Sequence, residues 1–288
     1  MKPVIILENN VEFWKLFLQK FPKSDVSLII VTDDRISDKM EELQNTAKQM
    51  RPDLSITYIS GKQLIKESFD ILWPNGTSDL IKDFVFNYKL SCKFFYPIYF
   101  KKFEKYLMVD DDVFMVLDPS FLFESDKYLA SVDSFNKFGW KDKYYKNFEI
   151  VCKKEIETYD YNIYTINTGI LLYQRDLEYG NYIKGLFENE FFCNLYLKYK
   201  QKNTTYNKLF FVEQYLFNFY LKTRENFKSK FEVLKNVRII TNPTIPGKFT
   251  KVPFAIHYTS GKEKMNLCHT FKHYEIINGY LTNTKKEN

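Results

Sequence analysis

The amino-acid sequence predicts an α/β fold with a mostly parallel central sheet, on three observations. Short apolar runs alternate with amphipathic helical segments in the first half of the chain, as is typical of parallel α/β sheets. The apolar run 106–109 leads directly into three aspartates, and strand carboxyl ends line the ligand crevice of open α/β sheets. The length of 288 residues fits one large domain, since domains usually contain roughly 50–250 residues.

The first half of the chain predicts three strands, at residues 4–7, 26–31 and 56–59. A helix over 11–21 is expected between the first two, because its large apolar residues fall on one helical face; these are Val11, Trp14, Phe17, Leu18 and Phe21. A second helix is expected after Ser37, which we interpret as its N-cap. Its apolar stripe consists of Met40, Leu43, Ala47 and Met50.

A turn at residues 74–76 then precedes a helix that we expect from Ser78 to about Lys93. Further strands are predicted at 106–109, 129–132 and 166–173, and residues 113–116 are again apolar. Residues 177–221 are helical and aromatic in character, and short strands are expected at 238–240 and 253–258. No repeat or linker interrupts the chain. We therefore expect a single α/β domain with a helical C-terminal lobe.

Composition limits the classes of partner. The net charge is +6, but the basic residues are almost all lysines, and arginine is the residue suited to bidentate contacts with phosphate and guanine; nucleic acid is not an expected partner. The four cysteines form no C-x-x-C pair, which disfavours a zinc site or redox dithiol.

No run approaches the ~20 apolar residues of a membrane span, and the N-terminus lacks a signal-peptide pattern. We expect a cytoplasmic protein.

Three aspartates, Asp110, Asp111 and Asp112, are the most informative feature of the sequence. On an extended chain Asp110 and Asp112 project to the same side, and two such carboxylates can hold a hard divalent cation and leave coordination positions for phosphate. The alternative is an acidic surface turn. The apolar residues on both sides, 107–109 and 113–116, favour the cation, because unpaired carboxylates next to apolar surroundings are costly.

Residues 105–116, Lys-Tyr-Leu-Met-Val-Asp-Asp-Asp-Val-Phe-Met-Val, resemble the DxD segment of family-8 glycosyltransferases, which are retaining nucleotide-sugar enzymes. Four other segments resemble family segments in the same order: 88–90, 166–172, 213–218 and 257–264. The resemblance spans 4–265 and implies the GT-A fold, a Rossmann-like nucleotide-diphospho-sugar transferase fold. It implies a nucleotide-binding half over 1–130, a half for donor sugar and acceptor over 131–265, and a tail over 266–288.

The resemblance also implies a metal site made of Asp110, Asp112 and His257. Two carboxylates and an imidazole suit Mn²⁺ better than Mg²⁺, the alternative ion, which prefers oxygen ligands and water. Further residues implied in binding the nucleotide diphosphate-sugar, besides Asp110, are Glu8, Asn10, Lys89, Asp111, Asp133 and Lys264.

Near the donor sugar the resemblance places Asn167, Glu213 and Gln214, with Asp133 as a further neighbour. Asp133 could equally cap a following helix. Asn167 is a polar amide in an apolar strand and therefore needs a partner, for which a sugar hydroxyl is a good candidate. Glu213 stands where the family usually has Asp, and the segment after His257 departs from the family pattern.

These features predict a metal-dependent retaining glycosyltransferase that moves a hexose from a UDP-sugar to a glycan or other hydroxyl acceptor. Retention can proceed through a covalent intermediate on Glu213 or by same-face attack, in which the departing phosphate takes the acceptor proton; we favour the second. The alternatives are a catalytically weak or inactive nucleotide-sugar or glycan binder of the same fold, and an inverting GT-A transferase. Relatives are sometimes dimers, so a homodimer is one expected state.

Overall fold

The computed structural model describes residues 1–8, 11–32, 37–87, 91–133, 165–190, 227–235, 237–240 and 253–258, together with positions 193, 197, 217, 220 and 221. Within these residues seven strands form one sheet in the order β3-β2-β1-β4-β7-β6-β8. Their bounds are β1 Pro3–Glu8, β2 Ser27–Thr32, β3 Ser55–Ser60, β4 Lys105–Asp110, β6 Tyr128–Asp133, β7 Thr165–Gln174 and β8 Phe231–Val233.

The large sheet is mostly parallel. Strands β1 to β4 are parallel to one another, and β6 is parallel to β8. Strand β7 runs antiparallel to its two neighbours, β4 and β6. The carboxyl ends of β1, β4 and β6 therefore meet the amino end of β7 at one edge of the sheet.

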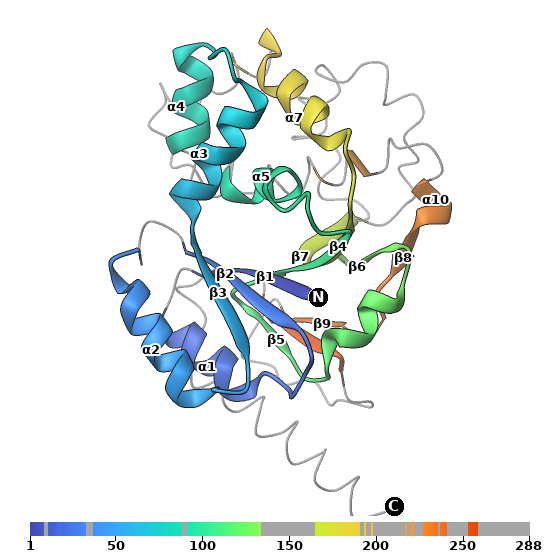
Figure 1. Ribbon diagram of the computed structural model, residues 1–288. Helices are drawn as coiled ribbons and strands as arrows, with labels where there is room; N and C mark the ends of the chain where they lie inside the picture. Colours follow the sequence, from blue (N-terminus) through green and yellow to red (C-terminus); the bar gives the residue numbers. More distant parts are fainter. Residues whose placement is uncertain are drawn as a thin grey trace, which may run out of the picture.

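Helices cover both faces of the large sheet (Figure 1). Helices α1 and α2 lie on one face, and α3, α4, α5 and α7 lie on the other. The helix bounds are α1 Val11–Lys20, α2 Met40–Met50, α3 Gly61–Leu72, α4 Asp79–Asn87, α5 Ser91–Tyr99, α7 Tyr179–Phe187 and α10 Phe227–Lys230, with 3₁₀ turns η1 Ser37–Lys39 and η2 Pro119–Glu124. Burial on both faces explains why β1, β2 and β4, in the middle of the sheet, are continuous apolar runs.

Two hydrophobic cores follow from the alternation of side chains along the strands. In β1, Ile5 and Leu7 belong to the core beneath α3 and α5, whereas Val4 and Ile6 belong to the core beneath α1 and α2. The core beneath α3 and α5 is rich in aromatic rings. There Phe187 of α7 contacts the rings of Trp73, Phe84, Phe94 and Phe95, among others.

A second, three-stranded sheet lies beside the large one and has the order β5-β10-β9. Its strands are β5 Val113–Met115, β9 Val237–Ile240 and β10 Ala255–Tyr258. Strand β10 is antiparallel to β5 and parallel to β9. Because β5 follows β4 after two residues, this small sheet attaches a late segment of the chain to the end of β4.

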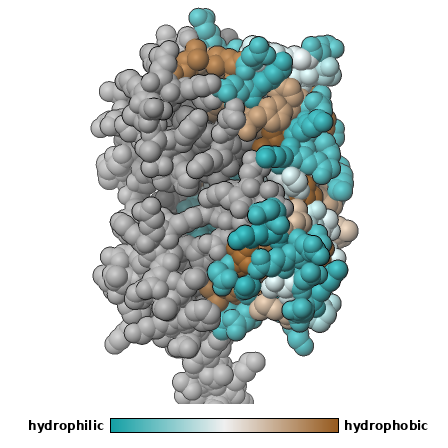
Figure 2. Space-filling model, turned by 90° about the vertical axis from the view of Figure 1, so that its left-hand side faces the viewer, coloured by the Kyte–Doolittle hydropathy of each residue, from teal (hydrophilic) through white to brown (hydrophobic). Residues whose placement is uncertain are grey.

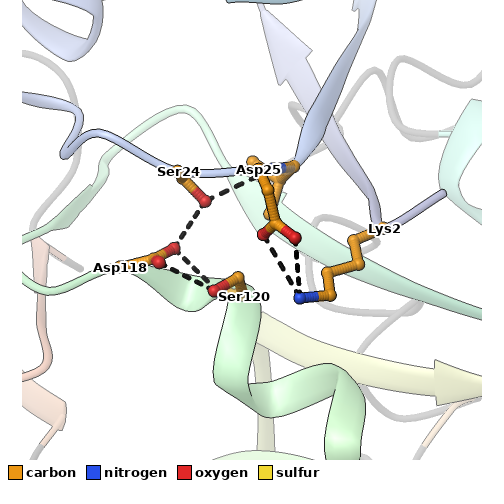
Figure 3. Close-up of polar contacts among 6 residues, drawn as sticks. Lys2, Ser24, Asp25, Asp118 and Ser120 are labelled. Carbon is orange, nitrogen blue, oxygen red and sulfur yellow. Dashed lines mark hydrogen bonds and ion pairs between the residues drawn. The ribbon is translucent and has the colours of Figure 1, made fainter.

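Polar contacts stabilise the 3₁₀ turn η2, which follows β5 (Figure 3). The side chain of Asp118 accepts hydrogen bonds from the backbone N–H and the hydroxyl of Ser120, at 2.9 and 2.7 Å, and so caps the turn η2. The hydroxyl of Ser24 donates to the same carboxylate. Nearby, Lys2 and Asp25 form an ion pair at 2.9 Å. These contacts tie η2 to the segment that enters β2.

All eight predicted strands are confirmed, as β1, β2, β3, β4, β6, β7, β9 and β10, whereas β5 and β8 were not predicted. In the range of the helix expected from Ser78 to about Lys93, the structure describes α4 and the start of α5, and residues 88–90 lie outside the described residues. Helix α3 was not predicted. The cap of α2 is Lys39 rather than Ser37, since the 3₁₀ turn η1 precedes that helix. Helix α7 confirms the start of the helical segment 177–221, most of which lies outside the described residues.

The face of the molecule that carries α2, α3 and α4 is mostly hydrophilic where it is described, with small separate apolar areas (Figure 2). Large hydrophobic side chains exposed on these three helices include Met50, Ile71 and Phe86. Among the described helices, none combines the length and the apolar character required to cross a lipid bilayer.

Candidate active site

The end of β4 places two carboxylates at the carboxyl edge of the large sheet. Residues 106–109 are fully buried, so the strand is fixed on both faces up to its last residue, Asp110. Asp111 and Asp112 form the turn into β5. The side chains of Asp110 and Asp112 are 21% and 25% exposed, so both carboxylates are partly withdrawn from water.

Strand pairing brings His257 to these carboxylates from almost 150 residues away. In the small sheet His257 of β10 pairs with Val113 of β5, the residue that follows Asp112. His257 is buried, and its Nε2 atom lies 3.3 Å from Oδ1 of Asp112. The register of β10 on β5 thus decides which late residue faces the aspartates.

Asp110, Asp112 and His257 can hold a metal ion. One ligand atom from each residue can be chosen so that all three lie within 4.8 Å of one another. Among the described residues, Nδ1 of His257 is buried without a hydrogen-bond partner, and Oδ1 of Asp112 is buried with the contact to Nε2 of His257 beside it. Buried polar atoms are almost always paired in folded proteins, so a cation between these side chains would account for atoms that are otherwise costly to bury. The donor set fits a divalent ion such as Mn²⁺ or Mg²⁺.

The electrostatics of the three side chains agree with this fit. Burial lowers the pKa of His257, but the negative charges of Asp112 and Asp110 outweigh it, so that the pKa is raised above the usual 6.5. The same carboxylates that favour protonation of the imidazole also attract a divalent cation. The proton and the cation therefore compete for the ring nitrogen.

Lys93 is a site residue that the sequence reasoning missed. It projects from α5, is buried, and forms an ion pair with Asp110, with 2.5 Å between Nζ and Oδ1. The sequence carried a signal for it: Lys93 is the one charge in the run 91–100, which is otherwise apolar, aromatic or small. A lone charge in such a run needs a partner once the helix is buried.

Asn167 lies at the same edge of the sheet, in β7. It is buried, and its Oδ1 accepts a hydrogen bond from the backbone N–H of Gly169 at 2.8 Å. The partner expected for this amide was a sugar hydroxyl. The structure assigns one of its polar atoms to the protein backbone instead.

The other residues named from the sequence divide into two groups. The backbone of Glu8 and that of Asp133 lie at the carboxyl edge: Leu7 pairs with Asp110, and Asp133 pairs with Thr165 at the start of β7. Asp111 is buried in the turn beside the two metal-ligand candidates. The remaining candidates lie outside the described residues; they are Asn10, Lys89, Glu213, Gln214 and Lys264.

Comparison with known proteins identifies the fold. No protein-family model and no curated protein matches the sequence. Among solved structures, the apo structure of the bifunctional glycosyltransferase WbbM matches 90% of this chain at 12% identity, with a TM-score of 0.57. The apo form of mouse xyloside xylosyltransferase 1 matches 92% at 9% identity, with a TM-score of 0.51. The chain has the GT-A fold.

This result confirms the predicted fold class. The match covers 99% of the xylosyltransferase chain but only 46% of the WbbM chain, so this chain spans about half the length of that bifunctional protein. At such low identity the likeness establishes the fold alone.

Proposed function

We propose that the protein is a metal-dependent glycosyltransferase that moves a hexose from a UDP-sugar to a hydroxyl acceptor with retention of anomeric configuration. The observation that carries the proposal is the convergence of Asp110, Asp112 and His257 at the carboxyl edge of a GT-A sheet. In open α/β sheets this edge is where ligands bind. The sequence resemblance to family-8 glycosyltransferases, made of five segments in order, supports the same reading.

In this proposal the three side chains hold a divalent cation, with Mn²⁺ as the ion best suited to a mixed oxygen and nitrogen donor set. When bound, such an ion supplies Lewis-acid stabilisation of the diphosphate leaving group. Lys93 limits the net negative charge of the aspartates through its contact with Asp110. A buried ammonium there leaves the site less repulsive toward an anionic donor.

The remaining roles are assigned from the sequence. Glu8 and Asn10 follow the first strand and are proposed to bind the nucleoside, while Lys89 and Lys264 are proposed to neutralise diphosphate charge. Asp133, Glu213 and Gln214 are proposed to surround the donor sugar. We favour same-face attack, with the departing phosphate taking the acceptor proton. A mass increase of one hexose on Glu213 after incubation with donor would establish the covalent route instead.

The test is UDP release across a panel of UDP-sugars, with Mn²⁺, with Mg²⁺ and with EDTA. We expect turnover with at least one donor, supported best by Mn²⁺ and abolished by EDTA. The Asp112→Asn variant should lose turnover by about two orders of magnitude or more, since removal of electrostatic stabilisation of the leaving group typically costs that much. Lys82→Met, a change on the exposed face of α4, is the control and should retain activity.

Two outcomes would overturn parts of the proposal. Binding of UDP without hydrolysis or transfer from any donor would identify a nucleotide-sugar binder rather than an enzyme. A product with inverted anomeric configuration, detected by NMR of the new anomeric proton, would show that the enzyme inverts. The reaction would then be a direct displacement, which needs a general base to deprotonate the acceptor.

A further inference from the structure

Gly169 lies against the ring of His257. A Cβ atom built on Gly169 would be 2.2 Å from Cε1, 2.7 Å from Nδ1 and 2.8 Å from Nε2 of the imidazole. Real Cβ contacts essentially never fall below 3.0 Å, so no other residue fits at position 169 while His257 keeps its place. His257 is only 4% exposed, so its ring is confined in the protein interior. The ring occupies space that is open because Gly169 has no side chain.

The backbone around Gly169 leaves the regular sheet. On β6, Ala130 pairs with Leu171 of β7, yet the next residue, Ser131, pairs with Asn167. Residues 168–170 of β7 are therefore extra relative to β6 and form a bulge. On the other side of β7, Val109 pairs with Ile170, so Asp110 and Gly169 are the next residues along their strands. The bulge thus lies beside the first metal-ligand candidate.

Asn167 holds this bulge. Its side chain folds back two residues along its own strand, and Oδ1 accepts the N–H of Gly169 at 2.8 Å, with both groups buried. A backbone N–H in a bulge lacks a partner in the ladder and is costly to bury unpaired. The hydrogen bond therefore stabilises the backbone conformation that places the Cα of Gly169 against the imidazole.

We infer that Asn167 and Gly169 are positioning residues that fix the imidazole of His257 for metal binding, Asn167 by holding the backbone of the bulge and Gly169 by leaving the space for the ring. This inference rests on the proposed function, because it concerns the same metal site. On this inference, the side-chain amide of Asn167 has a structural role in the protein that does not depend on contact with a donor sugar. Residues that orient a metal ligand typically change metal affinity by about 10- to 100-fold when they are replaced.

The first experiment needs neither metal nor substrate. It compares the melting temperatures of the parent protein, Gly169→Ala, His257→Ala and the double variant. If the added methyl group collides with the ring, Gly169→Ala lowers the melting temperature in the parent and has little effect in the His257→Ala background, where the ring is absent. An equal loss in both backgrounds would overturn the role of Gly169. Gly185→Ala is the matched control, because a Cβ there meets no atom within 4 Å.

The second experiment measures Mn²⁺ binding to the protein alone, by the electron paramagnetic resonance signal of free Mn²⁺. We expect Gly169→Ala and Asn167→Ala each to weaken binding about 10- to 100-fold. Asn167→Asp should restore it, since a carboxylate oxygen also accepts the Gly169 N–H. Unchanged Mn²⁺ affinity in Asn167→Ala would overturn the role of Asn167.

His257→Ala separates this inference from the proposed function. If His257→Ala does not weaken Mn²⁺ binding, the metal site itself fails, and the proposed function fails with it. If His257→Ala weakens binding while Gly169→Ala and Asn167→Ala do not, the metal site stands and the positioning role is wrong.

Discussion

Nζ of Lys93 lies 2.5 Å from Oδ1 of Asp110 and joins the amino end of α5 to the carboxyl end of β4. The ammonium is buried, whereas the carboxylate is 21% exposed. The same carboxylate lies within reach of His257 and Asp112 as a metal-ligand candidate. Asp110 is thus shared between a fixed positive charge on one side and the proposed cation on the other, and this relationship leads to the first prediction.

Replacing Lys93 by Met keeps most of the side-chain volume and removes the charge. Without metal, we expect the free energy of unfolding to fall by about 1–3 kcal/mol, because a charged group that loses its buried partner is left unsatisfied. Mn²⁺ should then raise the melting temperature of Lys93→Met more than that of the parent, since a competing positive charge has gone. Thermal unfolding with EDTA and with Mn²⁺ measures both effects.

Lys82→Met is the matched control for this change. Lys82 pairs with Asp79 at 3.2 Å, but the two side chains are 46% and 100% exposed. Exposed ion pairs contribute about 0–1 kcal/mol, so neither its stability nor its response to Mn²⁺ should change appreciably. A smaller Mn²⁺ response in Lys93→Met than in the parent would show that the lysine assists the metal instead of competing with it.

The three aspartates offer a comparison within one tripeptide. Asp110→Asn and Asp112→Asn each remove a charged ligand candidate, and we expect Mn²⁺ affinity to fall by about tenfold or more. Asp111→Asn should reduce it much less, because Asp111 is not part of the group of ligand atoms that lie within 4.8 Å of one another. Titration of Mn²⁺ against the three variants decides this. Equal losses would indicate that only the summed charge of the turn attracts the ion.

Much of the fold could be predicted because the strands are buried on both faces and their ends carry polar residues. The run 106–110 shows both features, so the strand and its position at a ligand edge followed from the sequence alone. Helix α3 was missed although its buried positions, which include Leu64, Ile65, Phe69 and Leu72, form a helical stripe. Its N-cap is Ser60, a residue type favoured at helix N-caps, and its charged residues lie on the exposed face, so the sequence held the pattern that predicts α3.

The site was harder to predict, because it depends on tertiary pairing. His257 reached the aspartates only through the register of β10 on β5, and the resemblance to a family supplied that residue where periodicity could not. For the helical lysine, Lys89 was chosen and Lys93 was found against Asp110. Lys89 lies outside the described residues, so its role stays a prediction.

Asp118 leads to a prediction on acid stability. Burial raises its pKa, but the hydrogen bonds from Ser24 and Ser120 outweigh burial, and the pKa lies below its usual value of 3.8. A carboxyl whose folded-state pKa is depressed stabilises the protein above its unfolded pKa, and this contribution is lost as the pH falls through the folded value. The free energy of unfolding should therefore fall below about pH 4, and Asp118→Asn should show a smaller fall over the same range.

Asp118→Ala separates the charge from the cap. Asn can still accept the Ser120 N–H, whereas Ala cannot, and loss of an N-cap costs about 0.5–2 kcal/mol. At neutral pH Asp118→Ala should therefore be less stable than Asp118→Asn, as measured by urea unfolding at several pH values. If the two variants are equally stable, the hydrogen bonds drawn in Figure 3 do not stabilise η2.

Phe187 tests whether α7 is essential to the core beneath α3 and α5. Its ring is 1% exposed and lies 5.2 Å from that of Phe84 and 5.9 Å from that of Phe94, between centroids. Phe187→Ala should lower the free energy of unfolding by about 3–5 kcal/mol, because it removes buried area and leaves a cavity. Phe121→Ala, at a residue that is 50% exposed and whose ring lies against that of Phe254, should cost less than about 1 kcal/mol. Urea unfolding of both variants measures the difference, and similar losses would mean that α7 packs more loosely than its aromatic contacts indicate.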